Sequence, residues 1–292
     1  MGKTREIKMR MKAVGNIRRI TKTMQMIATS RFAKAQAGAT ATKPYTEGIF
    51  GLVNELAATA GDVTHPLISG TGKVSGKELT LIITSDRGLC GPYNSSILRR
   101  SMGHLRSSPT AKAGVVELVG KKGISFIRYN NVTIAQTHTI GDKPTFERIE
   151  SLAQEYMNRF VAGEVDAVRI IYMKYHSPAR QSPEVLQLLP LKPPAAKKDL
   201  AAAKGPKLVY EFSPDAPELL GDLLPATVKA TLYQCFLDAI VSEHVARMIA
   251  MKAATDAAGK MRKLYSRAYN RARQAQITTE LSEIISGAAA LG

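Results

Sequence analysis

The stretch best suited to chemistry is a glycine-containing turn, SDRGLCGPYN, at residues 85–94. A β-branched run before it predicts a buried strand, and the residues after it predict a helix. A turn between a strand and a helix is where phosphate-binding loops occur. The turn has neither the GxGxxG spacing nor the Gly-Lys-Ser/Thr of a P-loop, and Pro92 removes one N–H that a phosphate cradle would use. We therefore expect a structural or contact role, with nucleotide binding as the alternative.

Residue types that bind metals or attack substrates are scattered along the chain. Cys90 lies in what looks like an exposed turn, but no His or Asp pattern beside it predicts a nucleophile. Cys235 falls on the apolar face of a helix, where burial in the core is expected. The histidines, which have no metal-binding spacing, are His65, His104, His138, His176 and His244. We predict no catalytic residue, no metal site, no cofactor and a reducing compartment.

Positive charge is the sharpest feature of the composition. The formal net charge is +17, and residues 1–43 and 243–273 hold nearly all of it. Such a field predicts an acidic partner, which could be nucleic acid, anionic lipid or a protein with acidic loops. Because the basic residues spread around helices with few aromatics, a coiled-coil shaft inside an acidic protein is favoured over a nucleic-acid binder. No apolar run is long enough to predict a membrane span.

Both ends of the chain predict long helices. Residues 232–291 contain no proline and are rich in strong helix formers. In the first 60 residues, apolar side chains step by three or four positions and predict one seam. They are Ile7, Met11, Val14, Ile17, Ile20, Met24 and Ile27. We predict an antiparallel coiled coil of the two helices, with the end of the longer C-terminal helix projecting beyond its partner.

Between the helices, strand and helix patterns alternate, which predicts an inserted Rossmann-like α/β domain with a mainly parallel sheet. Strands are expected at residues 78–84, 115–119, 132–136, 167–175 and 181–191. The predicted divisions are 1–62 for the N-terminal helix, 75–192 for the α/β domain, 193–209 for a low-complexity linker and 210–292 for the C-terminal helix. The fold class is therefore α/β with long terminal helices.

Long motifs in all three regions resemble the gamma subunit of F-type ATP synthase. They are RRITKTMQMIATSR from Arg18, SDRGLCG from Ser85 with Asn94, SEHVARMIAMKAATD from Ser242 and YNRARQAQITTELSEIISGAAA from Tyr269. The resemblance covers essentially the whole chain in the expected order. Two features depart from the family: Pro92 replaces a common glycine, and residues 192–207 have no strong family pattern.

The resemblance implies the central rotor shaft of a rotary synthase, a subunit that binds no nucleotide and performs no bond chemistry. Its coiled coil would turn inside a ring of three alpha and three beta subunits. Its α/β domain would stand with the epsilon subunit on the membrane c-ring. Proton flow would turn ring and shaft, so that the beta subunits make ATP from ADP and phosphate, or run in reverse on hydrolysis. Neither nucleic acid nor a small-molecule substrate is implied.

Matching positions imply contact roles for particular residues. The implied beta contacts are Lys22, Met24, Cys90, Arg247, Arg273 and Gln274, the upper-bearing residues are Thr278, Glu280 and Glu283, and the epsilon and c-ring contacts are Tyr210 and Phe212. We expect no transit peptide, and residues 192–207 lack the paired thiols of chloroplast relatives. We therefore expect a bacterial protein, peripheral on the cytoplasmic face of the plasma (inner) membrane.

Overall fold

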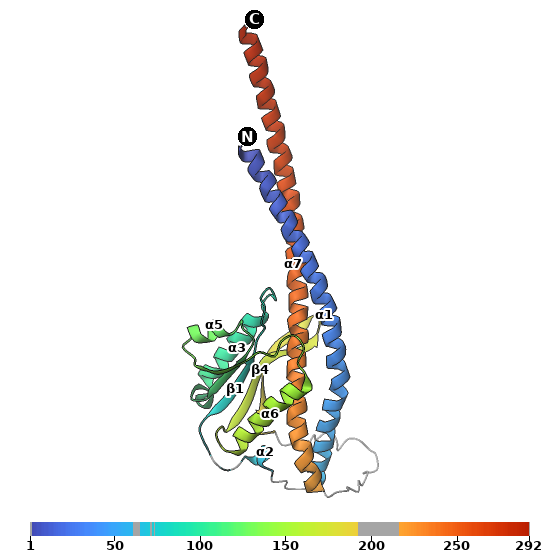
Figure 1. Cartoon of the computed structure of the whole chain (residues 1–292), viewed down its shortest axis with the longest axis vertical. Helices are drawn as coiled ribbons and strands as arrows, with labels where there is room; N and C mark the ends of the chain where they lie inside the picture. Colours follow the sequence, from blue (N-terminus) through green and yellow to red (C-terminus); the bar gives the residue numbers. More distant parts are fainter. Residues whose placement is uncertain (1, 61–64, 71, 73, 192–215, 292) are drawn as a thin grey trace. The chain divides into compact units, whose positions relative to one another are not determined.

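The computed structural model describes residues 2–60, 65–70, 72, 74–191 and 216–291. Its contacts divide the chain into two units. We call Met1–Ser30 with Arg247–Gly292 the helix-pair unit, and Arg31–Ala246 the sheet unit. Helix α1 (Gly2–Ala60) and helix α7 (Ala216–Leu291) each contribute residues to both units (Figure 1).

The two terminal helices are continuous, as predicted. Helix α7 has 76 residues, with Pro225 near its start, and α1 has 59 residues and continues through Pro44. A proline inside a helix removes one backbone hydrogen bond and crowds the preceding turn. Buried residues on both sides of Pro44, Ala39 and Ile49, keep this part of α1 packed in the sheet unit.

In the helix-pair unit, α1 and α7 run antiparallel. The Thr4 and Gln276 side chains hydrogen-bond at 2.9 Å, and the Thr21 and Thr255 hydroxyls hydrogen-bond at 2.8 Å. Positions that rise along α1 therefore meet positions that fall along α7. The predicted antiparallel pairing is confirmed.

The predicted seam of α1 is partly wrong. Val14 is buried, but Ile17, Ile20 and Ile27 are 52%, 57% and 50% exposed. A coiled-coil seam repeats every 3.5 residues, so its steps alternate between three and four. The predicted stripe advances by three residues twice in succession, from Val14 to Ile17 and then to Ile20, and so turns away from α7. Alternating steps instead reach Ala28, which is 1% exposed.

A five-stranded sheet forms the centre of the sheet unit, in the order β3-β2-β1-β4-β5. The strands are β1 (Glu78–Ile83), β2 (Val115–Val119), β3 (Ile134–His138), β4 (Ala167–Ser177) and β5 (Arg180–Leu189). All neighbouring pairs are parallel except β4 with β5, which confirms the mainly parallel prediction. Strand β3 begins two residues later than expected.

Helices cover both faces of this sheet, because its strands bury side chains on both sides. Leu81 of β1 joins a core with α6 and the nearby parts of α1 and α7, whereas Ile82 joins a core with α3, α4 and α5. Figure 1 shows α3 and α5 beside the sheet. The helix bounds are α2 (Pro66–Ser69), α3 (Tyr93–Ser107), α4 (Pro109–Lys112), α5 (Ile124–Tyr129) and α6 (Phe146–Val161).

The predicted domain boundaries stay a prediction. The linker expected at 193–209 lies outside the described residues. The sheet unit also contains residues 31–60 of α1 and 216–246 of α7, both of which pack in its core.

Candidate partner-contact surfaces

The turn at residues 85–94 is tied together internally and covered by α7. The Ser85 amide donates to Asn94 Oδ1 at 3.0 Å, and the Tyr93 hydroxyl donates to the Ala239 carbonyl of α7 at 3.1 Å. A cavity of only about 30 Å³ remains at this edge of the sheet, and Phe236 of α7 contributes to its lining. That volume holds a water molecule but no nucleotide. Helix α7 thus fills the crevice where open α/β sheets bind ligands.

The expectation that Cys90 is exposed is wrong, because its side chain is only 2% exposed. The Asn94 amide donates to Cys90 Sγ at 3.3 Å, and the thiol lies within the α3 core. Leu89 is instead 61% exposed and has a φ of 62°, a conformation that costs a non-glycine residue roughly 1–2 kcal/mol. Pro92 directly precedes α3 as its N-cap. The implied beta contact at Cys90 stays a prediction.

An ion cluster joins this turn to α1 within the sheet unit. Asp142, which follows β3, forms an ion pair with Arg31 of α1. The same carboxylate lies 3.9 Å from Arg87 of the turn. One acidic side chain thus connects three segments that are far apart in the sequence.

Two buried carboxylates in the sheet were missed by sequence reasoning. Glu117 of β2 is 1% exposed and accepts hydrogen bonds from His138 at 2.7 Å, Tyr156 at 2.8 Å and Arg159 at 2.8 Å. Burial by itself would raise the pKa of Glu117, but these hydrogen bonds outweigh burial and lower it. The signal in the sequence was one carboxylate inside an apolar strand, VVELV.

The second carboxylate repeats this arrangement on the opposite face of the sheet. Glu78 of β1 is 1% exposed, lies 2.6 Å from His104 Nε2 and accepts a hydrogen bond from Arg169 at 2.9 Å. Both clusters satisfy the carboxylate fully, which favours a structural role over general acid–base chemistry. Among the described residues, no group of three or more metal-ligating side chains lies close together.

Three of the implied beta contacts, Lys22, Met24 and Arg247, lie in the helix-pair unit. Lys22 is exposed, whereas Met24 and Arg247 are half-buried. Since Thr255 lies opposite Thr21, Arg247 is roughly 12 Å along α7 from the level of Thr21, the residue before Lys22. The structure therefore places these side chains along the same helix pair without bringing them into one compact cluster.

The upper group lies along α7 with its side chains accessible. Arg273, Gln274, Thr278, Glu280 and Glu283 are all exposed. The Thr278 hydroxyl donates to the Gln274 carbonyl of its own helix at 3.0 Å. The implied epsilon and c-ring contacts, Tyr210 and Phe212, lie outside the described residues.

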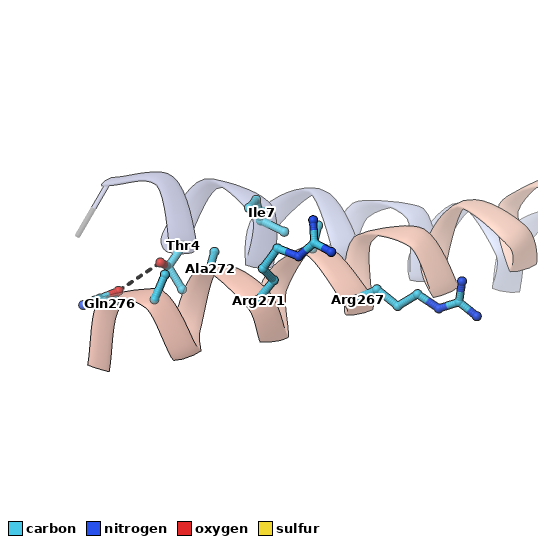
Figure 2. Close-up of a pocket in the computed structure, with 8 residues that line it drawn as sticks. Thr4, Ile7, Arg267, Arg271, Ala272 and Gln276 are labelled. Atoms are coloured by element: carbon cyan, nitrogen blue, oxygen red, sulfur yellow. Dashed lines mark hydrogen bonds between the residues drawn. The ribbon is translucent and has the colours of Figure 1, made fainter. Parts of the chain in front are cut away.

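The paired part of the two helices ends near Thr4 and Gln276. Figure 2 shows their hydrogen bond beside a groove lined by Ile7, Arg267 and Arg271. The groove measures about 690 Å³ and stays open because α7 contributes mainly alanines between its arginines. Helix α7 continues to Leu291, so its last turns run past the start of α1, as predicted.

The projecting end carries an apolar stripe that sequence reasoning also missed. Ile277, Leu281, Ile284 and Ile285 are between 55% and 68% exposed. Their spacing of three and four residues places them on one face of α7. Exposed apolar patches of this kind mark protein–protein contacts. The available signal was the continuation of a seam pattern beyond the last residue with a partner in α1.

Within the described ranges, no helix is both long enough and apolar enough to span a bilayer.

Comparisons with known proteins agree over the whole chain. A family model described as ATP synthase matches residues 3–291. Proteins named ATP synthase gamma chain from Rhodopirellula baltica and Leptospira biflexa are each 40% identical to this chain. The first alignment covers 100% of this chain and 99% of the relative, and the second covers 100% of both.

Solved structures show the same fold. A chain of the Euglena gracilis mitochondrial ATP synthase, solved as OSCP/F1/c-ring in rotational state 3, matches with a TM-score of 0.67 and 19% identity. The match covers 99% of this chain and 95% of that chain. A chain of the Tetrahymena thermophila mitochondrial ATP synthase central stalk/c-ring matches with a TM-score of 0.56 and 20% identity, covering 80% of this chain and 99% of that chain.

Proposed function

Because the chain belongs to the ATP synthase gamma chain family, we propose that it is the central-stalk rotor subunit of a proton-translocating F-type ATP synthase. One copy would turn inside three alpha and three beta subunits and stand with epsilon on the c-ring. The chain itself would be non-catalytic, and rotation would drive ATP synthesis on beta from ADP and phosphate, or the reverse. We place the complex on the cytoplasmic face of a bacterial inner membrane, with this chain peripheral.

The observation that carries this proposal is the division of roles around the helix pair. Small and polar residues, including Ala28, Thr21 and Thr255, occupy the interface between α1 and α7. Large apolar side chains such as Ile17 and Ile20 point outward. A shaft needs internal packing for stiffness and an outer surface for its surrounding partners. This surface offers both apolar area and positive charge to a ring with acidic loops.

ATPase turnover of the assembled complex tests the proposed beta contact at Arg273 and Gln274. We expect Arg273→Ala with Gln274→Ala to lower ATPase turnover roughly tenfold, because both exposed side chains would lose polar contacts to the ring. Lys263→Ala, an exposed residue of the same helix outside the implied contacts, is the control and should leave turnover unchanged. Wild-type turnover in the double variant would refute the contact assignment.

Purification separates the rotor role from the nucleic-acid alternative. A rotor subunit should remain with the alpha–beta hexamer at high salt, because apolar contacts survive screening. A nucleic-acid binder should instead be retained on DNA and released steeply as salt rises. Release from the hexamer together with salt-sensitive DNA retention would contradict the proposal.

A further inference from the structure

A hollow lies in the helix-pair unit where the interface between α1 and α7 is polar. Its volume is about 500 Å³, and Gly15 and Thr255 form part of its wall. Its charged lining residues are Arg18, Arg19, Lys22, Lys252, Arg262 and Asp256. All of these belong to the same unit of the structure.

The hollow exists because the seam lacks large side chains at this level. After Val14, the alternating steps of the seam reach Arg18 and Thr21 instead of large apolar residues. Gly15 has no side chain, and nothing lies within 4 Å of the place where its Cβ would be. The Arg18 side chain extends over Gly259, with Nε 3.5 Å from the corresponding Cβ position. The gap is therefore built into the sequence of both helices.

The charges around the hollow are unbalanced. Five cations and one carboxylate, Asp256, line the hollow, and none of the five forms an ion pair within 4.0 Å with any described acidic residue. Arg19 donates a long hydrogen bond to the uncharged side chain of Asn16 at 3.3 Å. Like charges that line one hollow repel one another, and a multivalent anion would relieve that repulsion.

We propose that this hollow binds a short inorganic polyphosphate, of the class of pyrophosphate and tripolyphosphate. Three of the five cations are arginines, whose planar forks match pairs of phosphate oxygens. The cations come from both helices, which suits a short chain of phosphates better than one compact anion. The volume fits such a ligand but is small for a folded acidic peptide segment. Asp256 opposes anion binding, which supplies a second test.

Calorimetric titration of the full chain with tripolyphosphate, near physiological salt, tests the proposal. We expect one binding site per chain. Arg18→Gln with Arg262→Gln should weaken binding roughly tenfold, because two charge-assisted contacts are lost. Asp256→Asn should tighten binding roughly threefold, because the repelling carboxylate is removed.

The matched control is Lys260→Gln with Lys263→Gln, which removes two charges from the same stretch of α7 without touching the hollow. This variant should change the affinity less than twofold, and circular dichroism should show all variants folded. Equal weakening by both double variants, several equivalents bound or no binding would each overturn the proposal. Tighter, residue-dependent binding of polyglutamate would also overturn it and assign the hollow to an acidic peptide. The titration uses the unassembled chain, so its failure leaves the rotor role untouched.

Discussion

At the scale of single residues, the sheet is organised around Glu78 and Glu117, each buried and each bonded to a histidine and an arginine. A buried carboxylate is costly unless its oxygens are satisfied, and removal of one member leaves the others unpaired. Strands β1 and β2 therefore each need one glutamate within an otherwise apolar sequence. Substitution of Glu78 or Glu117 should lower the free energy of unfolding.

We expect Glu117→Gln to lower the free energy of unfolding by about 3 kcal/mol, because Arg159 loses its buried ionic partner. Urea unfolding followed by circular dichroism measures the change. Glu155→Gln, on the exposed face of α6, should change it by less than about 0.5 kcal/mol. A loss of equal size in both variants would show that the buried cluster is not responsible.

The lowered pKa of Glu117 also sets the direction of a pH effect. A carboxyl whose folded pKa is below its unfolded value contributes stability above the unfolded pKa, here near 4.5, and loses it as pH falls through the folded value. The stability difference between wild type and Glu117→Gln should therefore be full near neutral pH and shrink below about pH 4.5. A difference that grows on acidification would contradict this assignment.

At the scale of elements, the corrected seam predicts different costs for neighbouring apolar residues. Val14→Ala removes two buried methyl groups and should destabilise the helix pair by about 1–2 kcal/mol. Ile17→Ala removes more atoms, but from an exposed side chain, and should cost less than about 0.5 kcal/mol. Thermal unfolding compares the two. A larger cost at Ile17 would restore the seam that the sequence pattern first suggested.

This seam shows how far the sequence alone could predict the structure. The order of the two terminal helices and the five strands could be predicted, because the periodicity changes where α1 gives way to β1 and where β5 precedes α7. The side of α1 that packs against α7 could not be predicted, because Ile17 and Ile20 continue the apolar pattern but lie on the outer surface. The burial of Cys90 was also hidden, since it depends on a core that brings residues of β2 and β4 together with α3. Contacts between distant segments leave little local trace.

At the scale of the whole molecule, we expect the projecting end of α7 to be needed for assembly but not for folding. A chain that ends at Gln276 loses exposed side chains, including the apolar stripe at Ile277 and Leu281. Its free energy of unfolding should stay within about 0.5 kcal/mol of the full chain. Its yield in the assembled complex should fall, because the proposed contacts with the ring would be lost. Size-exclusion chromatography of the reconstituted complex measures the yield.

A large loss of stability in this shortened chain would show that the projecting end packs within the subunit. Unchanged assembly would show that the apolar stripe contributes nothing to the ring contact. A chain with Ile284→Ser alone provides the milder comparison, since it alters one exposed side chain and keeps the full length of α7.

The exposed isoleucines of α1 also have a consequence for the subunit before assembly. Ile17, Ile20 and Ile27 remain half exposed in the folded subunit, so correct folding does not hide them. Chaperones and proteases act on exposed apolar surface of this kind. A copy made in excess of the ring would be removed, whereas a copy made in step with the ring would be protected by it. The same three side chains would thus couple the abundance of this subunit to the supply of the others.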